Sequence, residues 1–99
     1  MSKTISMMKF NPGTIVMTRG VNDQIADNEE FAKHAHLSLK RHLTGDWGDV
    51  CDEDRISNEE ALQQGHRLFS VYKNGDLPIL WIITEWDRSV TTLLFPDEY

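Results

Sequence analysis

Three short runs of strand-forming residues in the last third of the chain restrict the fold more than any other feature. They cover residues 68–72, 80–85 and 90–95 and are rich in β-branched, leucine and aromatic side chains, which suit strands. Asn74-Gly75 marks a turn after the first run, and Trp86-Asp87-Arg88-Ser89 joins the second run to the third. Strands joined by such short connections pair with each other, so the sequence predicts an antiparallel meander.

A fourth strand is predicted near the N-terminus. Residues 14–18 read T-I-V-M-T, a β-branched run between the turn signal Asn11-Pro12-Gly13 and Gly20. Residues 1–13 are expected to form an irregular lead-in without the apolar region of a secretory signal. No apolar run approaches the roughly 20 residues of a membrane span, so we expect a cytoplasmic protein.

The main helix is predicted to run from a cap at Asp27 to about Leu43. Glu30 lies at the reciprocal position of a capping box, and Gly45 is suited to a left-handed C-terminal cap. One apolar stripe recurs every four residues, as in a helix packed on a core. It consists of Phe31, Ala35, Leu39 and Leu43.

A second, short helix is predicted from the capping box Ser57-Asn58-Glu59-Glu60 to Gly65. The 99 residues suit a single domain, residues 1–99, and Cys51 alone cannot form a disulfide within the chain. The predicted fold class is α+β: a twisted antiparallel sheet, the C-terminal meander plus the N-terminal strand, packed by one main and one short helix.

Charge is concentrated in residues 46–60, which hold seven acids and one base, Arg55, and so account for the whole net charge of −6. The stretch before the capping box is expected to be a loop. Charge of this kind governs association more than fold, and it argues against nonspecific nucleic-acid binding. The seven acids are Asp46, Asp49, Asp52, Glu53, Asp54, Glu59 and Glu60.

Three interpretations of this segment remain open. It can be a solvated polar loop whose last two acids cap a helix. It can be an acidic docking surface that imitates the phosphates of a nucleic acid, since a row of acids can match a basic groove. It can also be a divalent-cation loop, given Asp52-x-Asp54, although the EF-hand pattern fails because position 6 is Ser57 and position 12 is Gln63.

Trp47 lies between acids and is expected either to anchor the loop in the core or to serve as an exposed binding residue. Trp81 and Trp86 fall at an odd spacing, so one of them is expected to be partly exposed. A second acidic patch is predicted near the end of the sheet. It would comprise Glu85, Asp87, Asp97 and Glu98.

Catalytic interpretations have weaker support. Cys51 with His42 as base and Asp46 as its partner lacks any signature, and neighbouring carboxylates raise rather than lower a thiol pKa. His34-x-His36 points in divergent directions on a helix and does not suit zinc. No cofactor or metal site is predicted.

Two strings, G-D-W-G-D-V-C-D-E-D-R (45–55) and L-W-I-I-T-E-W-D-R-S-V-T-T-L-L-F-P-D-E-Y (80–99), resemble a family of small bacterial proteins labelled plasmid-related, from mobile elements. The resemblance spans most of the chain from Phe31 onward and implies no catalytic residue. In size and acidity the chain is also similar to anti-CRISPR inhibitors that act as DNA mimics, those of type I systems most closely.

These observations together predict a non-enzymatic inhibitor that blocks the basic DNA-binding groove of a bacterial complex such as a type I CRISPR effector, and that binds neither nucleic acid nor membrane itself. The residues expected to bind the partner are Asp46, Trp47, Asp49, Asp52, Glu53, Asp54, Glu59, Glu60, Glu85 and Asp87. The alternatives are a small carboxylate- or metal-dependent hydrolase and an accessory protein-binding module of plasmid biology. Converging carboxylates in a cleft favour the enzyme, and a convex acidic face favours the mimic.

Overall fold

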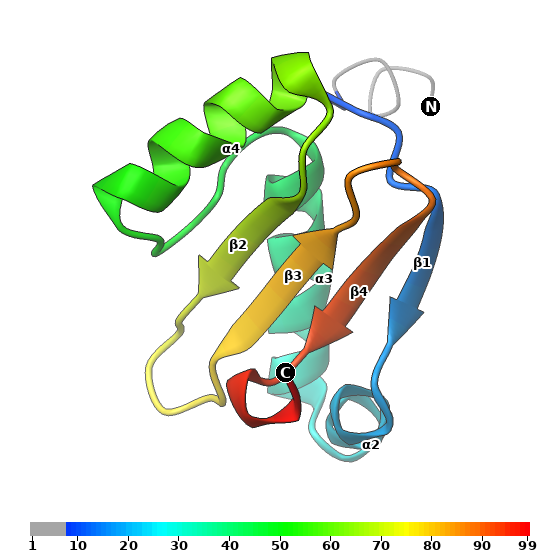
Figure 1. Cartoon of the computed structure of the whole chain (residues 1–99). Coiled ribbons are helices and arrows are strands. Elements are labelled where there is room, and N and C mark those ends of the chain that lie inside the picture. The colour runs from blue at the N-terminus through cyan, green and yellow to red at the C-terminus, as the bar shows by residue number, and fades with distance from the viewer. Residues whose placement is uncertain (1–7) are drawn as a thin grey trace.

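The computed structural model describes residues 8–99 and confirms the α+β class, with one four-stranded sheet and helices against it (Figure 1). The strands follow the order β1-β4-β3-β2 across the sheet. In chain order the elements are β1 (Thr14–Met17), α2 (Arg19–Asp27), α3 (Glu29–Leu43), α4 (Asp52–Gln64), β2 (Leu68–Tyr72), β3 (Leu80–Thr84), β4 (Val90–Leu94) and the short 3-10 helix η1 (Pro96–Glu98).

The C-terminal meander is confirmed. β2 pairs antiparallel with β3, with Ser70 opposite Ile82, and β3 pairs antiparallel with β4, with Ile82 opposite Leu93. The prediction of a wholly antiparallel sheet is wrong, because β1 lies parallel to β4. The chain leaves β1 through three helices, α2, α3 and α4, and returns through the meander, and the first and last strands run in the same direction, side by side (Figure 1).

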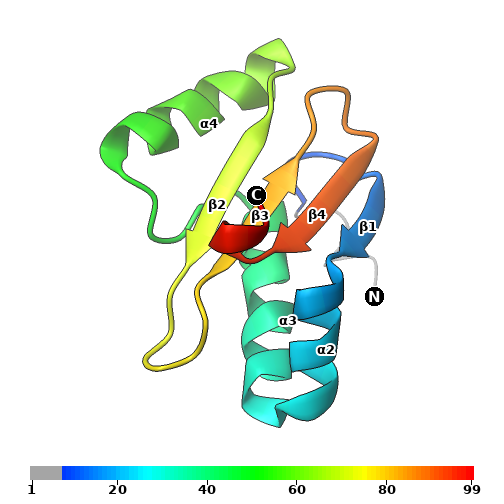
Figure 2. The same ribbon diagram turned by 60° about the horizontal axis from the view of Figure 1, so that its bottom comes forward.

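α3 is the predicted main helix, and it covers one face of the sheet (Figures 1 and 2). Its cap is Asn28 rather than Asp27, since the Asn28 side chain accepts hydrogen bonds from the backbone of Glu30 and Phe31. At the other end Gly45 adopts a left-handed conformation, φ +86°, as predicted. Its N–H donates to His42 O, and the next N–H donates to Arg41 O, which closes the helix as a Schellman motif.

α2 was not predicted, and no element was assigned between Gly20 and Asp27. Thr18 caps it, because its hydroxyl accepts a hydrogen bond from the Val21 N–H. Val21 is its one buried residue, and Ile25, one turn further along, packs against the core from the same side. α2 lies against α3, as Figure 2 shows from below.

α4 begins five residues before the predicted capping box. Asp52, Glu53 and Asp54 form its first turn, where carboxylates are favoured by the partial positive charge of a helix N-terminus. Cys51 takes the N-cap position without a side-chain hydrogen bond, and Ser57 lies inside the helix. The predicted loop over the acidic segment is therefore wrong from residue 52 onward.

The core lies between α3 and the sheet, where Phe31, Ala35 and Val21 pack with buried residues of β2, β3 and β4. A smaller cluster of Trp47, Ala61 and Leu68 lies under α4. Part of the predicted lead-in, residues 1–7, lies outside the described residues; residues 8–13 are irregular, as expected. Within residues 8–99 no helix is long and apolar enough to cross a membrane.

Candidate acidic interaction surface

Arg88 in the β3–β4 turn holds the C-terminal end of α4 in place. Its guanidinium donates to the carbonyl oxygens of Ala61, at 2.9 Å, and His66, at 2.6 Å. A cation at these carbonyls also interacts favourably with the negative end of the helix dipole. Because Arg88 has φ +59°, the turn itself is shaped to bring the guanidinium to the end of α4.

Asn58 fixes the middle of α4 to the edge of β2. It is buried within the helix, and its side-chain amide donates to Phe69 O at 2.7 Å and accepts from Phe69 N–H at 3.0 Å. The Asn58 amide thus makes the two backbone hydrogen bonds that a neighbouring strand would otherwise make with Phe69 of β2. Sequence patterns do not reveal this role, because a polar residue in a polar helix is expected to face water.

The loop before α4 covers the next position along the same edge. Asp49 N–H donates to Val71 O at 2.6 Å, and Val71 N–H donates to Trp47 O at 3.2 Å. Gly48 lies between these bonds with φ +76°, and a side chain there would collide with Val71 O. The carboxylate of Asp49 accepts from Lys73 N–H at 2.9 Å, which closes the edge beyond the strand.

Asp46 belongs to the structure of this loop rather than to a free acidic surface. Arg41 binds its two carboxylate oxygens at 2.8 Å and 3.1 Å, and the Gly48 N–H donates to it as well. The Arg41 guanidinium, and to a lesser degree the Gly48 N–H, hold the pKa of Asp46 below its usual value. The carboxylate is therefore already compensated within the chain.

Trp47 is buried, with 3% of its surface exposed, so of its two interpretations the core anchor is confirmed. Its ring packs against Phe10 and His42, and its indole N–H donates to Glu59 Oε2 at 2.8 Å. Trp47 therefore contributes no surface for a partner, which corrects its place among the predicted binding residues. Trp86 is the exposed tryptophan, at 65%.

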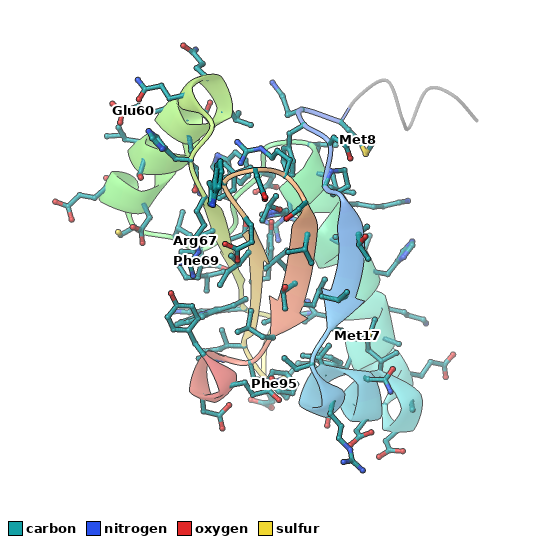
Figure 3. All side chains as sticks on the ribbon, turned by 45° about the vertical axis from the view of Figure 1, so that its right-hand side comes forward. Met8, Met17, Glu60, Arg67, Phe69 and Phe95 are labelled. Carbon is teal, nitrogen blue, oxygen red and sulfur yellow. The ribbon has the colours of Figure 1, made fainter. Side chains whose placement is uncertain are left out.

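The remaining acids of the segment lie on the exposed part of α4 (Figure 3, where Glu60 is labelled). Asp52 forms an ion pair with Arg55 one turn further along. In the part of the chain that the structure describes, no side-chain hydrogen bond or ion pair involves Glu53, Asp54 or Glu60. These three carboxylates are free to meet a partner, and we call them with Asp52 the α4 acidic face.

The predicted second acidic patch does not form. Glu85 and Asp87 lie at the β3–β4 turn, before β4 begins, whereas Asp97 and Glu98 lie in η1, after β4 ends. Asp87 accepts from the backbone and hydroxyl of Ser89, which lowers its pKa. Glu98 accepts from the Thr18 hydroxyl at 2.6 Å and joins η1 to the start of α2. The four acids thus lie at opposite ends of one strand, where Asp87 and Glu98 serve local structure.

A groove of about 320 Å³ separates α4 from the open face of the sheet. Its aromatic side chains are in edge contact, with Phe69 and Trp81 ring centres 5.0 Å apart (Phe69 and Arg67 are labelled in Figure 3). Of the described residues that line it, Asp54 is the one carboxylate. The full lining is Asp54, Ser57, Asn58, Arg67, Phe69, Trp81 and Tyr99.

The cysteine nucleophile is ruled out by geometry. His42 is fully buried, whereas Cys51 is exposed at the start of α4 and Asp46 is bound to Arg41. The loop required for a cation site is absent too, because Asp52 and Asp54 lie in a helical turn. His34 is buried and His36 exposed, so the two diverge as predicted.

His42 instead begins a buried chain of hydrogen bonds that the sequence did not reveal. Its ring nitrogens bind Ser70 Oγ at 2.6 Å and Thr84 Oγ1 at 2.9 Å, and Thr84 contacts Thr91 at 2.7 Å. Because the Thr91 hydroxyl donates to Pro12 O, Thr84 must donate to Thr91 and His42 Nε2–H to Thr84. Burial lowers the pKa of His42 to about 3, so near pH 7 the ring is neutral and its Nδ1 accepts from the Ser70 hydroxyl.

A function for this chain is inferred from the geometry and charge of residues 46–64. Comparison of the chain with protein-family models, with curated proteins and with solved structures finds no match in any of the three.

Proposed function

We propose that this chain is a non-enzymatic inhibitor from a mobile genetic element that occupies the basic DNA-binding groove of a bacterial defence complex, of the kind formed by type I CRISPR effectors. It acts in the cytoplasm of the bacterial host and binds neither nucleic acid nor membrane itself. The α4 acidic face makes the contact. The observation that carries the proposal is that Glu53, Asp54 and Glu60 are exposed on one helix without partners in residues 8–99.

Helical spacing gives these acids a regular arrangement. Glu53 and Glu60 are seven residues apart, so both carboxylates lie on one side of α4. The rise of a helix puts them about 10 Å apart along its axis. Duplex DNA carries one phosphate per about 3.4 Å of helix axis on each strand, so this interval corresponds to the axial rise of about three phosphates.

The hydrolase alternative has less support. Carboxylate catalysis uses two acids whose environments separate their pKa values, and a cleft that brings them together. Asp54 is the one acidic side chain among the described residues of the groove, and Arg67 also lines it. An acidic helix on the outside of the domain suits binding better than catalysis.

A competition experiment tests the proposal. A purified type I CRISPR effector complex is incubated with labelled target DNA, and increasing amounts of the protein are added in a gel-shift assay. The wild-type chain should displace DNA, and displacement should weaken steeply with salt because exposed charges are screened. The variant Glu53→Gln/Asp54→Asn/Glu60→Gln should lose most of this effect, mainly through slower association.

A matched variant separates position from net charge. Asp23→Asn/Asp27→Asn/Asp76→Asn changes the charge by the same three units at exposed sites outside α4, and it should still displace DNA. Circular dichroism should show that both variants remain folded. Failure of the wild-type chain to displace DNA, or equal displacement by both triple variants, would exclude the α4 acidic face as a DNA mimic of this complex.

A further inference from the structure

The outer edge of β1 has backbone groups that point away from the sheet. Thr14 and Thr18 donate their N–H groups to Ser89 O and Leu93 O, so the even-numbered residues of β1 face β4. Backbone groups alternate along a strand, and the N–H and C=O of Ile15 and Met17 therefore point outward. No hydrogen bond within residues 8–99 reaches these four groups. What they can bind is another strand.

The side chains of this edge are apolar and exposed. Ile15, Val16 and Met17 expose 42%, 38% and 41% of their surface, although such residues are usually buried in a sheet. Figure 3 shows β1 at the front of the sheet, with Met17 labelled at its end. The strand carries no charge, whereas edge strands commonly use charged residues to prevent pairing.

The strand is complementary to itself. In an antiparallel pair related by a two-fold axis at Val16, Ile15 of each copy lies opposite Met17 of the other. The outward groups of both residues then exchange hydrogen bonds, four in all, and the two Val16 side chains meet at the axis. The same two-fold places the α2 helices, which follow β1 directly, at opposite ends of the pair.

Charge does little to oppose a second copy at this edge. The acidic helix α4 packs against β2, which is the opposite edge of the sheet from β1. In a continuous eight-stranded sheet the two α4 helices would lie at the outer ends, roughly 30 Å or more apart at the usual strand spacing. That separation exceeds the screening length of about 8 Å, so the net negative charge of each copy opposes association weakly.

We propose that β1 of this chain pairs antiparallel with β1 of a second copy, and that the protein forms a reversible two-fold dimer through a continuous sheet. This dimer does not depend on the function proposed above. It is small and dissociates on dilution, because a four-residue strand buries less surface than a permanent interface.

Sedimentation of the full chain over a concentration series, with amide hydrogen exchange measured by NMR, tests this interface. Dimer should accumulate with concentration, and the amides of Ile15 and Met17 should become protected in parallel. Val16→Lys places like charges at the axis and should raise the dissociation constant about tenfold or more. Ile15→Pro removes one outward N–H without touching the bonds to β4 and should also weaken the dimer.

Leu37→Lys is the matched control, since Leu37 is another exposed apolar residue, on α3. It should leave the dimer unchanged. A monomer at every concentration would overturn the proposal, as would a dimer unaffected by both β1 variants while they remain folded. Protection of the Ile15 and Met17 amides that is independent of concentration would mean that the chain covers this edge itself, and it would overturn the proposal as well.

Discussion

The two edges of the sheet differ in how their backbone groups are satisfied. Along β2, Asn58 binds Phe69, the segment around Gly48 binds Val71, and Asp49 binds Lys73. Along β1, the outward groups of Ile15 and Met17 meet no described residue. One edge is closed by side chains and a loop, and the other is open.

The difference explains why several acidic and polar residues of the 46–60 segment are not available to a partner. Asn58, Asp49 and Gly48 close the β2 edge, and in doing so they attach α4 to the sheet. The acids that remain unpaired are those on the outside of α4. A segment that reads as one acidic cluster in sequence therefore divides into a structural part and an exposed part.

The largest effect is expected from Gly48→Val, which breaks the closed edge. A Cβ at this position would lie 2.1 Å from Val71 O and 2.7 Å from the Tyr72 ring, in a left-handed conformation. Strain and overpacking together should lower the free energy of unfolding by about 4 kcal/mol. Urea denaturation measures this loss, and the Val71 amide should lose its protection from exchange.

Gly75→Val serves as its control. Gly75 is also left-handed, φ +53°, but a side chain there would meet no atom within 4 Å. The loss should be about 1–2 kcal/mol, from the backbone conformation alone. Equal losses in the two variants would show that contact with β2 contributes nothing to the requirement for glycine at position 48.

A somewhat smaller loss is expected from Asn58→Leu, which keeps the side-chain size and removes both hydrogen bonds to Phe69. Two backbone groups would then be left without partners at a buried site, and the free energy of unfolding should fall by about 3 kcal/mol. Asn22→Leu, on the exposed side of α2, should change it by less than about 0.5 kcal/mol. Thermal denaturation of both variants decides whether Asn58 closes the edge.

Acid should weaken both edges together, because the hydrogen-bond chain from His42 runs through β2, β3 and β4 to Pro12 beside β1. The pKa of His42 is lowered from 6.5 to about 3, so below pH 6.5 the unfolded chain binds a proton that the folded chain excludes. The contribution to stability is complete above pH 6.5 and is lost as the pH falls. The free energy of unfolding should be about 2 kcal/mol lower at pH 5 than at pH 7.

His42→Gln tests the source of this dependence. The variant should be less stable at pH 7 and should lose most of the slope between pH 7 and pH 5. His34, whose pKa is also lowered by burial, accounts for the part that remains. An unchanged slope in the variant would show that groups other than His42 cause the pH dependence of stability.

The smallest effect is expected at the open edge. Ile15→Thr keeps the β-branched shape of the side chain. Ile15 is already exposed and does not belong to the core between α3 and the sheet. At concentrations where the chain is monomeric, the free energy of unfolding should change by about 0.5 kcal/mol or less. A loss comparable to that of Asn58→Leu in chemical denaturation would show that β1 is not a free edge.

Local patterns predicted the elements whose signals lie within a few residues. The meander followed from three β-rich runs and their turns, α3 from its apolar stripe, and the left-handed Gly45 from its place after that helix. α2 was missed because its apolar stripe is only two large residues long, Val21 and Ile25, and because Gly20 in its first turn was taken as the end of a strand. The start of α4 was misplaced because a second cap signal at Ser57 looked stronger than three acids in a first turn.

Other features depend on contacts that are distant in sequence. The parallel pairing of β1 with β4 and the binding of Asn58 to Phe69 have no local signature. The acidic segment was recognised, but nothing in its spacing shows that Asp46 binds Arg41 or that Glu59 accepts from Trp47. That Glu53, Asp54 and Glu60 bind a partner stays a prediction.

The neighbourhood of β1 and β4 also has a consequence for how the chain folds. The bond from Thr91 to Pro12 joins residues 79 positions apart, and within residues 8–99 β1 has no other strand beside it. Of the four strands β1 is synthesised first and its partner β4 last, so the sheet cannot be completed until β4 has left the ribosome. Pairing over such a separation slows folding, since the entropy of closing a long loop is lost before the contacts form. Until then, the uncharged T-I-V-M segment lacks its neighbouring strand and is open to pairing with other chains.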